Sequence, residues 1–294
     1  MHRLLAYILF LAAIVSASAG QLFAATPEDG PAFRMVPELD AGFRLLYEQK
    51  FAAARETFLG WENQHPGEPF GHIATAASYL FEEFYRQGVL SSEFFLNDKK
   101  FLRGIDGKPD AERMKGFHQA RERAIETARQ RLQANPHDAE ALYALTLAAG
   151  MLADALSILE KKHLDSLRQI KEADASARRL LAERPDAADA WLALGAANYI
   201  VGSLSGTTRF FLWFGGIHGD RTLGMAQLDK TAKDGRYLRP FAKILLALAA
   251  RREKQDELAR RLLRELTEEF PASPLFAAEY ARAADQKTAT PRVR

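Results

Sequence analysis

The 294-residue chain contains no cysteine. This absence excludes disulfide bonds, catalysis by a thiolate and a lipoprotein anchor, because each of them needs a cysteine sulfur. An excess of charge of one sign is also missing: Lys and Arg total 40, Asp and Glu total 38, and the formal net charge is +2. A nearly neutral chain has no overall field that would attract nucleic acid, so we expect no nucleic-acid partner.

The sequence also lacks the sustained alternation of β-branched and polar residues that is typical of β-strands. Its apolar residues, mainly Ala and Leu, recur at helical spacing among charged residues of both signs, which predicts an all-α fold. We expect helices at residues 38–48, 52–64, 70–87, 112–134, 139–163, 164–183, 187–201, 221–233, 239–251, 255–269 and 274–284.

The N-terminus has the pattern of an export signal. Residues 1–3 are a short positive start, residues 4–15 form an unbroken apolar run, and small residues follow that permit cleavage after Ala19 or Ala24. Residues 1–24 are therefore predicted to be a signal peptide, which places the mature chain in the periplasm or outside the cell.

The alternative is an uncleaved helix that anchors the chain, although a membrane-spanning helix needs about 20 mostly apolar residues. Beyond the leader, residues 25–284 are predicted to be one helical domain and the polar residues 285–294 a disordered tail. The last helix, 274–284, carries Glu and Arg on an expected outer face and is predicted to cap the domain.

The most informative motif begins at Trp191, six residues after Pro185, and reads W-x2-L-G-x2-N. Just upstream, Ala173 and Ala177 precede that proline at the spacing A-x3-A. Together they resemble the tetratricopeptide repeat, whose opening half is W-x2-L-G-x2-Y and whose closing half is A-x3-F…P. The resemblance implies a stack of antiparallel helical hairpins, with Trp191, Leu194 and Gly195 packed against Ala173 and Ala177.

The same frame fits before Pro66, Pro136 and Pro271, but the intervals between these prolines depart from the repeat length of about 34 residues. We therefore expect an α-solenoid of degenerate repeat-like hairpins with two insertions, at residues 90–109 and 202–219; an irregular helical bundle is the alternative. The frame assigns structural roles to Gly42, Ala54, Phe58, Pro66, Ala173, Ala177, Pro185, Trp191, Leu194, Gly195, Gly224, Leu228, Ala259 and Pro271.

Residues 199–236 are also similar to a group of exported bacterial tetratricopeptide proteins with an aromatic insertion before a Gly-Asp-Arg helix. A more distant likeness is to the inclusion-body-clearance family of the mitochondrial outer membrane. Neither likeness implies an activity for this chain, because helical repeats serve as scaffolds for many unrelated functions.

Signals for catalysis and for cofactors are weak. The spacing Glu62-x-x-His65 and Glu160-x-x-His163 is that of a di-iron helical bundle. However, His65 precedes a turn proline and two lysines stand between the residues of the other pair, so all four side chains are expected to be solvated. No serine-nucleophile, phosphate-loop or dinucleotide motif is complete. We expect no cofactor, no metal and no enzymatic activity.

The second insertion holds Arg209, Phe210, Phe211, Trp213 and Phe214, five side chains that the repeat does not require. They are expected either to be buried against a hairpin or to contact a protein partner, a lipid or a membrane surface.

The leading functional hypothesis is a scaffold that binds a peptide or a protein in a concave groove, with Tyr143 and Asn198 as candidate groove residues. The alternative is a carrier of an apolar or lipid ligand that uses the aromatic insertion as a cover.

Overall fold

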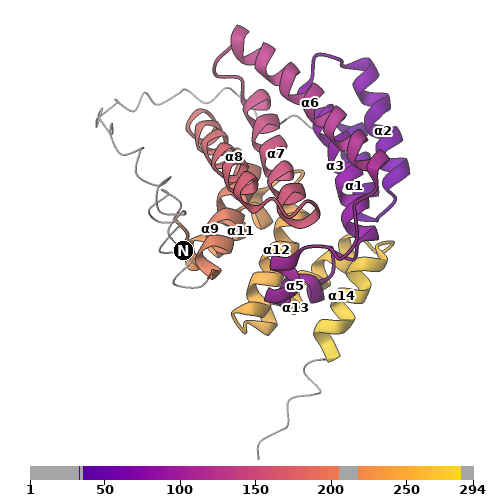
Figure 1. The fold of residues 1–294 in the computed structure, drawn as a ribbon, viewed down its shortest axis with the longest axis vertical. Coiled ribbons are helices and arrows are strands. Elements are labelled where there is room, and N and C mark those ends of the chain that lie inside the picture. The colour runs from indigo at the N-terminus through magenta and orange to yellow at the C-terminus, as the bar shows by residue number, and fades with distance from the viewer. Residues whose placement is uncertain (1–32, 34–35, 205–217, 286–294) are drawn as a thin grey trace, which may run out of the picture.

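The structure is a computed structural model that describes residue 33, residues 36–204 and residues 218–285. The predicted signal peptide, the insertion residues Arg209, Phe210, Phe211, Trp213 and Phe214, and all but the first residue of the predicted tail lie outside the described residues. Within them the chain is all-helical and contains no strand, which confirms the all-α part of the expected fold class (Figure 1).

Most helices begin and end within two residues of the predicted bounds, because proline turns and capping residues mark the ends in the sequence. The helices are α1 Pro37–Tyr47, α2 Phe51–Gln64, α3 Pro69–Arg86, α4 Ser92–Leu96, α5 Asp98–Arg103, α6 Ala111–Ala134, α7 Ala139–Asp154, α8 His163–Glu183, α9 Trp191–Ser203, α11 Arg221–Asp234, α12 Arg239–Arg252, α13 Asp256–Glu269 and α14 Pro274–Asp285.

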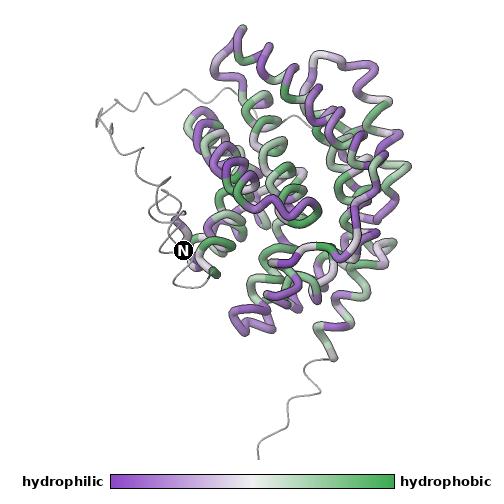
Figure 2. The backbone as a smooth tube through the Cα atoms, in the orientation of Figure 1, coloured by the Kyte–Doolittle hydropathy of each residue, from purple (hydrophilic) through white to green (hydrophobic). Residues whose placement is uncertain are grey.

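The helices form an inner and an outer layer. Helices α1, α3, α7, α9 and α12 contact one another in that order, while α2, α6, α8 and α11 each pack against the two inner helices that precede and follow them in the chain. The inner helix α7 is largely apolar in Figure 2, whereas the outer helices α6 and α8 present many hydrophilic residues. The inner layer is thus the more apolar of the two, as the alternation of more and less apolar segments in the sequence requires.

Four connections from one helix to the next share one turn geometry. The residue before Pro66, Pro136, Pro185 and Pro271 accepts a backbone hydrogen bond from the residue three positions later, at 2.9–3.1 Å. Proline suits the second position of such a turn because its φ is already fixed near the required value. Three of these turns follow the outer helices α2, α6 and α8, and the fourth follows α13.

The chain also has three lengthened connections. They follow α3, α7 and α9, which are inner helices. The first contains α4 and α5, which the sequence did not predict, and its residues Val89, Phe94 and Ile105 form a second apolar cluster with α3 and α6. The predicted insertion at 90–109 is therefore a packed element of the fold.

One expected helix ends early. Residues 139–163 were predicted as a single helix, but α7 ends at Asp154 and a π-helical turn covers Ala155–Leu159. The backbone N–H of Ile105 and the hydroxyl of Ser166 donate to the carbonyls of Ile158 and Ala153. Two neighbouring segments therefore contact the chain at this widened turn.

Residues 139–159 are also the one helical stretch, within the described residues, that is long and apolar enough to cross a membrane. Of the apolar window in this stretch, 56% is buried inside the fold. Its side chains Leu142, Tyr143 and Ala148 belong to the main core, which accounts for the hydropathy without a membrane.

Segments from the two ends of the chain meet, because α1 and the turn after it contact the segments that precede α12 and α14. The Tyr47 hydroxyl of α1 donates to the Tyr237 carbonyl at 2.8 Å, and Arg236 pairs with Asp40 at 2.6 Å. The Ser273 hydroxyl donates to Gln49 at 2.9 Å. One apolar cluster consequently runs from α1 to α14.

In the last helix, which the sequence predicts to be a cap, the position expected for Glu279 was wrong. Glu279, expected on an outer face, is 6% exposed and accepts a hydrogen bond from the backbone N–H of Ser92 at 3.2 Å. The Arg251 guanidinium of α12 also donates to the Ser92 hydroxyl, at 2.7 Å. The expectation was wrong because the first insertion folds onto this end of the chain, a contact that the helix pattern alone does not reveal.

Candidate functional site

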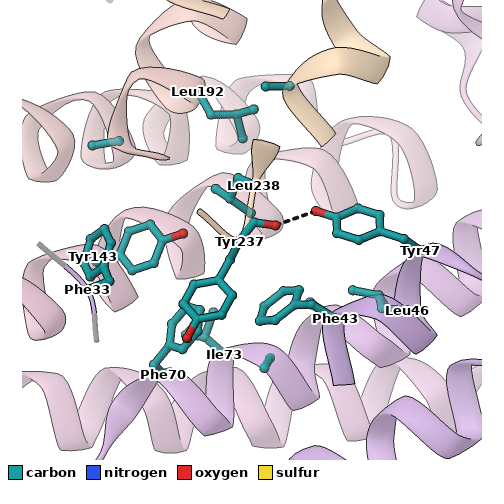
Figure 3. Packing of buried hydrophobic residues seen from close by; sticks show 14 of the residues in the cluster. Phe33, Phe43, Leu46, Tyr47, Phe70, Ile73, Tyr143, Leu192, Tyr237 and Leu238 are labelled. Atoms are coloured by element: carbon teal, nitrogen blue, oxygen red, sulfur yellow. Dashed lines mark hydrogen bonds between the residues drawn. The ribbon is translucent and has the colours of Figure 1, made fainter. Parts of the chain in front are cut away.

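A layer of aromatic rings lies between the inner helices (Figure 3). Phe43 lies on α1, Phe70 on α3 and Tyr143 on α7, and Tyr237 lies two residues before the start of α12. The ring centroids of Phe70 lie 5.3 Å from Tyr143 and 4.8 Å from Tyr237, and Phe43 lies 4.9 Å from Tyr237. All four side chains are less than 9% exposed, so the expected concave face is filled with aromatic rings.

A fifth ring of this layer comes from the segment before α1. Phe33 stands in a bend before α1, is 8% exposed, and stacks on Tyr143 with centroids 4.3 Å apart and an angle of 27° between the planes. Figure 3 shows it beside Tyr143, at the edge of the labelled cluster. The inner face therefore holds an aromatic side chain from a non-helical segment.

A buried carboxylate, that of Asp189, fixes the position of the Tyr143 ring on which Phe33 stacks. The Tyr143 hydroxyl donates to Asp189 at 2.9 Å, and the backbone N–H groups of Arg236 and Tyr237 donate to the same carboxylate at 2.7 and 2.9 Å. Burial raises the pKa of Asp189, and these hydrogen bonds partly offset the rise. Burial, together with the nearby Asp189, likewise raises the pKa of Tyr143 well above its usual value. Asp189 thus ties α7 to the turn before α12.

The two predicted groove residues have different places. Tyr143 does lie on the inner face, but it is 1% exposed beneath Phe33 and is not open to solvent. Asn198 donates to Gln227 at 2.8 Å across the contact between α9 and α11. Asn198 is therefore a structural residue, and its prediction as a groove residue was wrong because its polar group is taken up by the neighbouring helix.

The predicted small residues lie at close helix contacts in two hairpins. A Cβ atom added to Gly42 would come within 2.2 Å of the Phe58 ring, and one added to Gly195 would come within 2.9–3.0 Å of Leu228 and Gly224. The frame gives Phe58 and Leu228 the same position. Gly195 faces α11, however, so its predicted contact with Ala173 and Ala177 of α8 was wrong. Spacing along the chain does not tell which neighbouring helix a small residue faces.

The remaining predicted structural positions are mostly buried. Ala54, Ala173, Ala177, Leu194 and Ala259 are at most 5% exposed. Trp191 is only half-buried, and its indole nitrogen is buried without a hydrogen-bond partner among the described residues.

The two Glu-x-x-His motifs do not come together as a metal site. Glu62, expected in solvent, is 5% exposed and accepts hydrogen bonds from His72 at 2.7 Å and from Thr75. The imidazole of His65 stacks on Trp61 instead. The sequence prediction for Glu62 was wrong because helix α3 supplies two donors that make its burial favourable.

Glu160 pairs with Lys162 at 2.7 Å, and His163 lies 3.4 Å from the hydroxyl of Ser157. In the part of the chain that the structure describes, no group of three or more metal-ligating side chains is found.

Two surface hollows lie away from the aromatic layer. One, of about 510 Å³, is lined by residues that include Arg221, Met225, Asp229 and Leu258 along α11, α12 and α13. The other, of about 440 Å³, lies on the outer helix α2. Neither lining includes a ring of the aromatic layer, and we take the inner face as the candidate site.

Comparison of the chain with models of known protein families and with curated proteins finds no match.

Proposed function

We propose that this chain is an exported scaffold of tetratricopeptide-like hairpins that binds a polypeptide on its inner face, without catalysis. The hairpins are α1–α2, α3–α6, α7–α8, α9–α11 and α12–α13, with α14 at the end of an α-solenoid. Each proline turn then follows the second helix of a hairpin, as the repeat requires.

Two further observations support this division. The first and last hairpins contain the same turn, with Gln49 and Lys254 at φ of 57° and 60°. In both, the next residue donates its N–H to the carbonyl five positions earlier. The contact of a glycine in the first helix with a large apolar residue in the second also recurs, as Gly42 with Phe58 and Gly195 with Leu228. Recurrence of a turn and of a contact favours repeated hairpins over an irregular bundle.

The observation that carries the function is Phe33 on the inner face. A solenoid presents its inner helices as an extended surface for a bound chain, and here a non-helical segment places a buried ring against Tyr143. An extended partner with an apolar side chain would meet the same stacked rings. The predicted export signal at residues 1–24 supports a location of this binding in the periplasm or outside the cell.

The test is crosslinking in the native cell envelope, followed by identification of the captured molecule by mass spectrometry. We expect a polypeptide partner whose yield falls for Tyr143→Leu, which removes the ring. The yield should be unchanged for Gly60→Ala on the outer helix α2, where an added Cβ contacts nothing within 4 Å. Phe70→Leu is the second inner-face variant if Tyr143→Leu loses its cooperative unfolding. Equal capture by inner-face and control variants would contradict the inner-face site.

The alternative function is carriage of an apolar or lipid ligand, with the aromatic insertion as its cover. Residues Ile200 and Leu223, on the helices that flank this insertion, are 37% and 48% exposed. A lipid present at one molecule per purified chain, with no captured polypeptide, would favour this alternative.

A further inference from the structure

Phe33 differs from the other rings of the aromatic layer in how it is held. Phe43, Phe70 and Tyr143 are fixed by the helices that carry them, and Tyr237, in a bend, by backbone hydrogen bonds with Asp189 and Tyr47. Phe33 also stands in a bend outside any helix. Among the described residues no backbone hydrogen bond involves Phe33, and its one ring contact is with Tyr143. Its position therefore depends on the burial of its ring.

The surface beneath Phe33 is held by contacts that do not involve it. Tyr143 is fixed by its hydrogen bond to Asp189, at 2.9 Å, and by stacking on Phe70 at 5.3 Å. Phe70 in turn packs on Tyr237, which donates its N–H to Asp189. A binding surface that is already rigid loses little conformational freedom when a ring docks on it.

The following inference rests on the proposed function. We propose that the place where the Phe33 ring lies is a binding site for an aromatic side chain of an extended partner segment. Phe33 occupies this site in cis, from within the same chain, until the partner displaces it. An aromatic ring is favoured over an aliphatic side chain because Tyr143 presents a flat π-face. Stacked rings gain an attraction in addition to the free energy of burying their apolar surface. The polar end of the site is closed, since the Tyr143 hydroxyl already has Asp189 as its acceptor.

Occupation in cis has a quantitative consequence. The apparent affinity of a partner is the intrinsic affinity multiplied by the fraction of molecules whose site is free. If Phe33 fills the site in about nine of ten molecules, removing its ring strengthens binding about tenfold. A residue that merely completed the core would not show this gain.

The experiment uses the full mature chain and a labelled synthetic peptide with the sequence of residues 27–38, which contains Phe33. Fluorescence anisotropy should show that this peptide binds the Phe33→Ala chain at least about tenfold more tightly than the parent chain. A peptide with Ala at the Phe33 position should bind neither chain. The Gly60→Ala chain serves as the matched control and should bind like the parent. The peptide should also raise the Tm of the Phe33→Ala chain, because a ligand of the native state stabilises it.

The proposal is overturned if the peptide binds the Phe33→Ala and parent chains equally, or if the Ala peptide binds as well as the Phe peptide. Phe33→Leu, which keeps an apolar side chain but no ring, replaces Phe33→Ala if that variant does not fold, with the same expected gain. A failure of peptide binding alongside capture of a partner in the envelope would reject this inference alone. A failure of both would reject the proposed function as well.

Discussion

The substitution Gly224→Ala tests the close contact between α9 and α11. A Cβ atom at position 224 would lie 2.5 Å from the backbone nitrogen of Tyr199 and 2.8 Å from the carbonyl oxygen of Gly195. Both are backbone atoms, so the two helices would have to move apart. Overpacking of this kind costs about 1–3 kcal/mol.

The matched control is Gly60→Ala in the interior of α2, where an added Cβ meets nothing within 4 Å. Alanine is favoured over glycine in a helix by about 1 kcal/mol, and this gain applies to both variants. The free energy of unfolding of Gly224→Ala should therefore lie about 1–3 kcal/mol below that of Gly60→Ala, since only the first has the overpacking cost.

The assay is urea denaturation followed by far-ultraviolet circular dichroism, with the parent chain measured alongside both variants. Gly60→Ala should unfold at a higher urea concentration than the parent. If Gly224→Ala is stabilised to the same extent, α9 and α11 do not approach as described, and the hairpin around the second insertion is wrong.

Three other outcomes are expected. Asp189→Ala should lower the free energy of unfolding by about 3 kcal/mol or more, because the Tyr143 hydroxyl and two backbone N–H groups lose a buried acceptor; Asp189→Asn should lose less in the same denaturant titration. Burial raises the pKa of half-buried Asp154 to about 7, from 3.8, so its contribution to stability is greatest below pH 4 and falls as the pH rises to 7. Asp154→Asn should therefore gain stability over the parent across that range, by at most about 4 kcal/mol, and a difference independent of pH would contradict this. N-terminal sequencing of the exported chain should find Gly20 or Ala25 first, and a retained leader would instead indicate an anchor.

The helices could be predicted from the sequence because their signals are local. Proline turns and apolar spacing mark α2, α6 and α13 to within one residue at each end. The helices α4 and α5 were missed because segments of five and six residues are too short to show a period.

The candidate site could be predicted only in part, because its residues come from distant segments. Tyr143 was identified from its place on an inner helix. Asp189 has the sequence context of an ordinary residue at the start of a helix, and nothing local shows that it accepts hydrogen bonds from residues 236–238. Phe33 is a single aromatic residue in a linker, and only the folded chain places it on Tyr143. The contact between α1 and the segment before α12 is likewise a tertiary contact with no local pattern.

The most direct test of the inner-face site is photocrosslinking from residue 33. Azidophenylalanine in place of Phe33 in the full mature chain keeps the ring and reacts with its neighbours on illumination. Mass spectrometry of the purified chain should locate the crosslink within α7, in the peptide that contains Tyr143, because the two rings are stacked 4.3 Å apart. Crosslinks scattered over the outer helices α2, α6 and α8, with none in α7, would contradict the account.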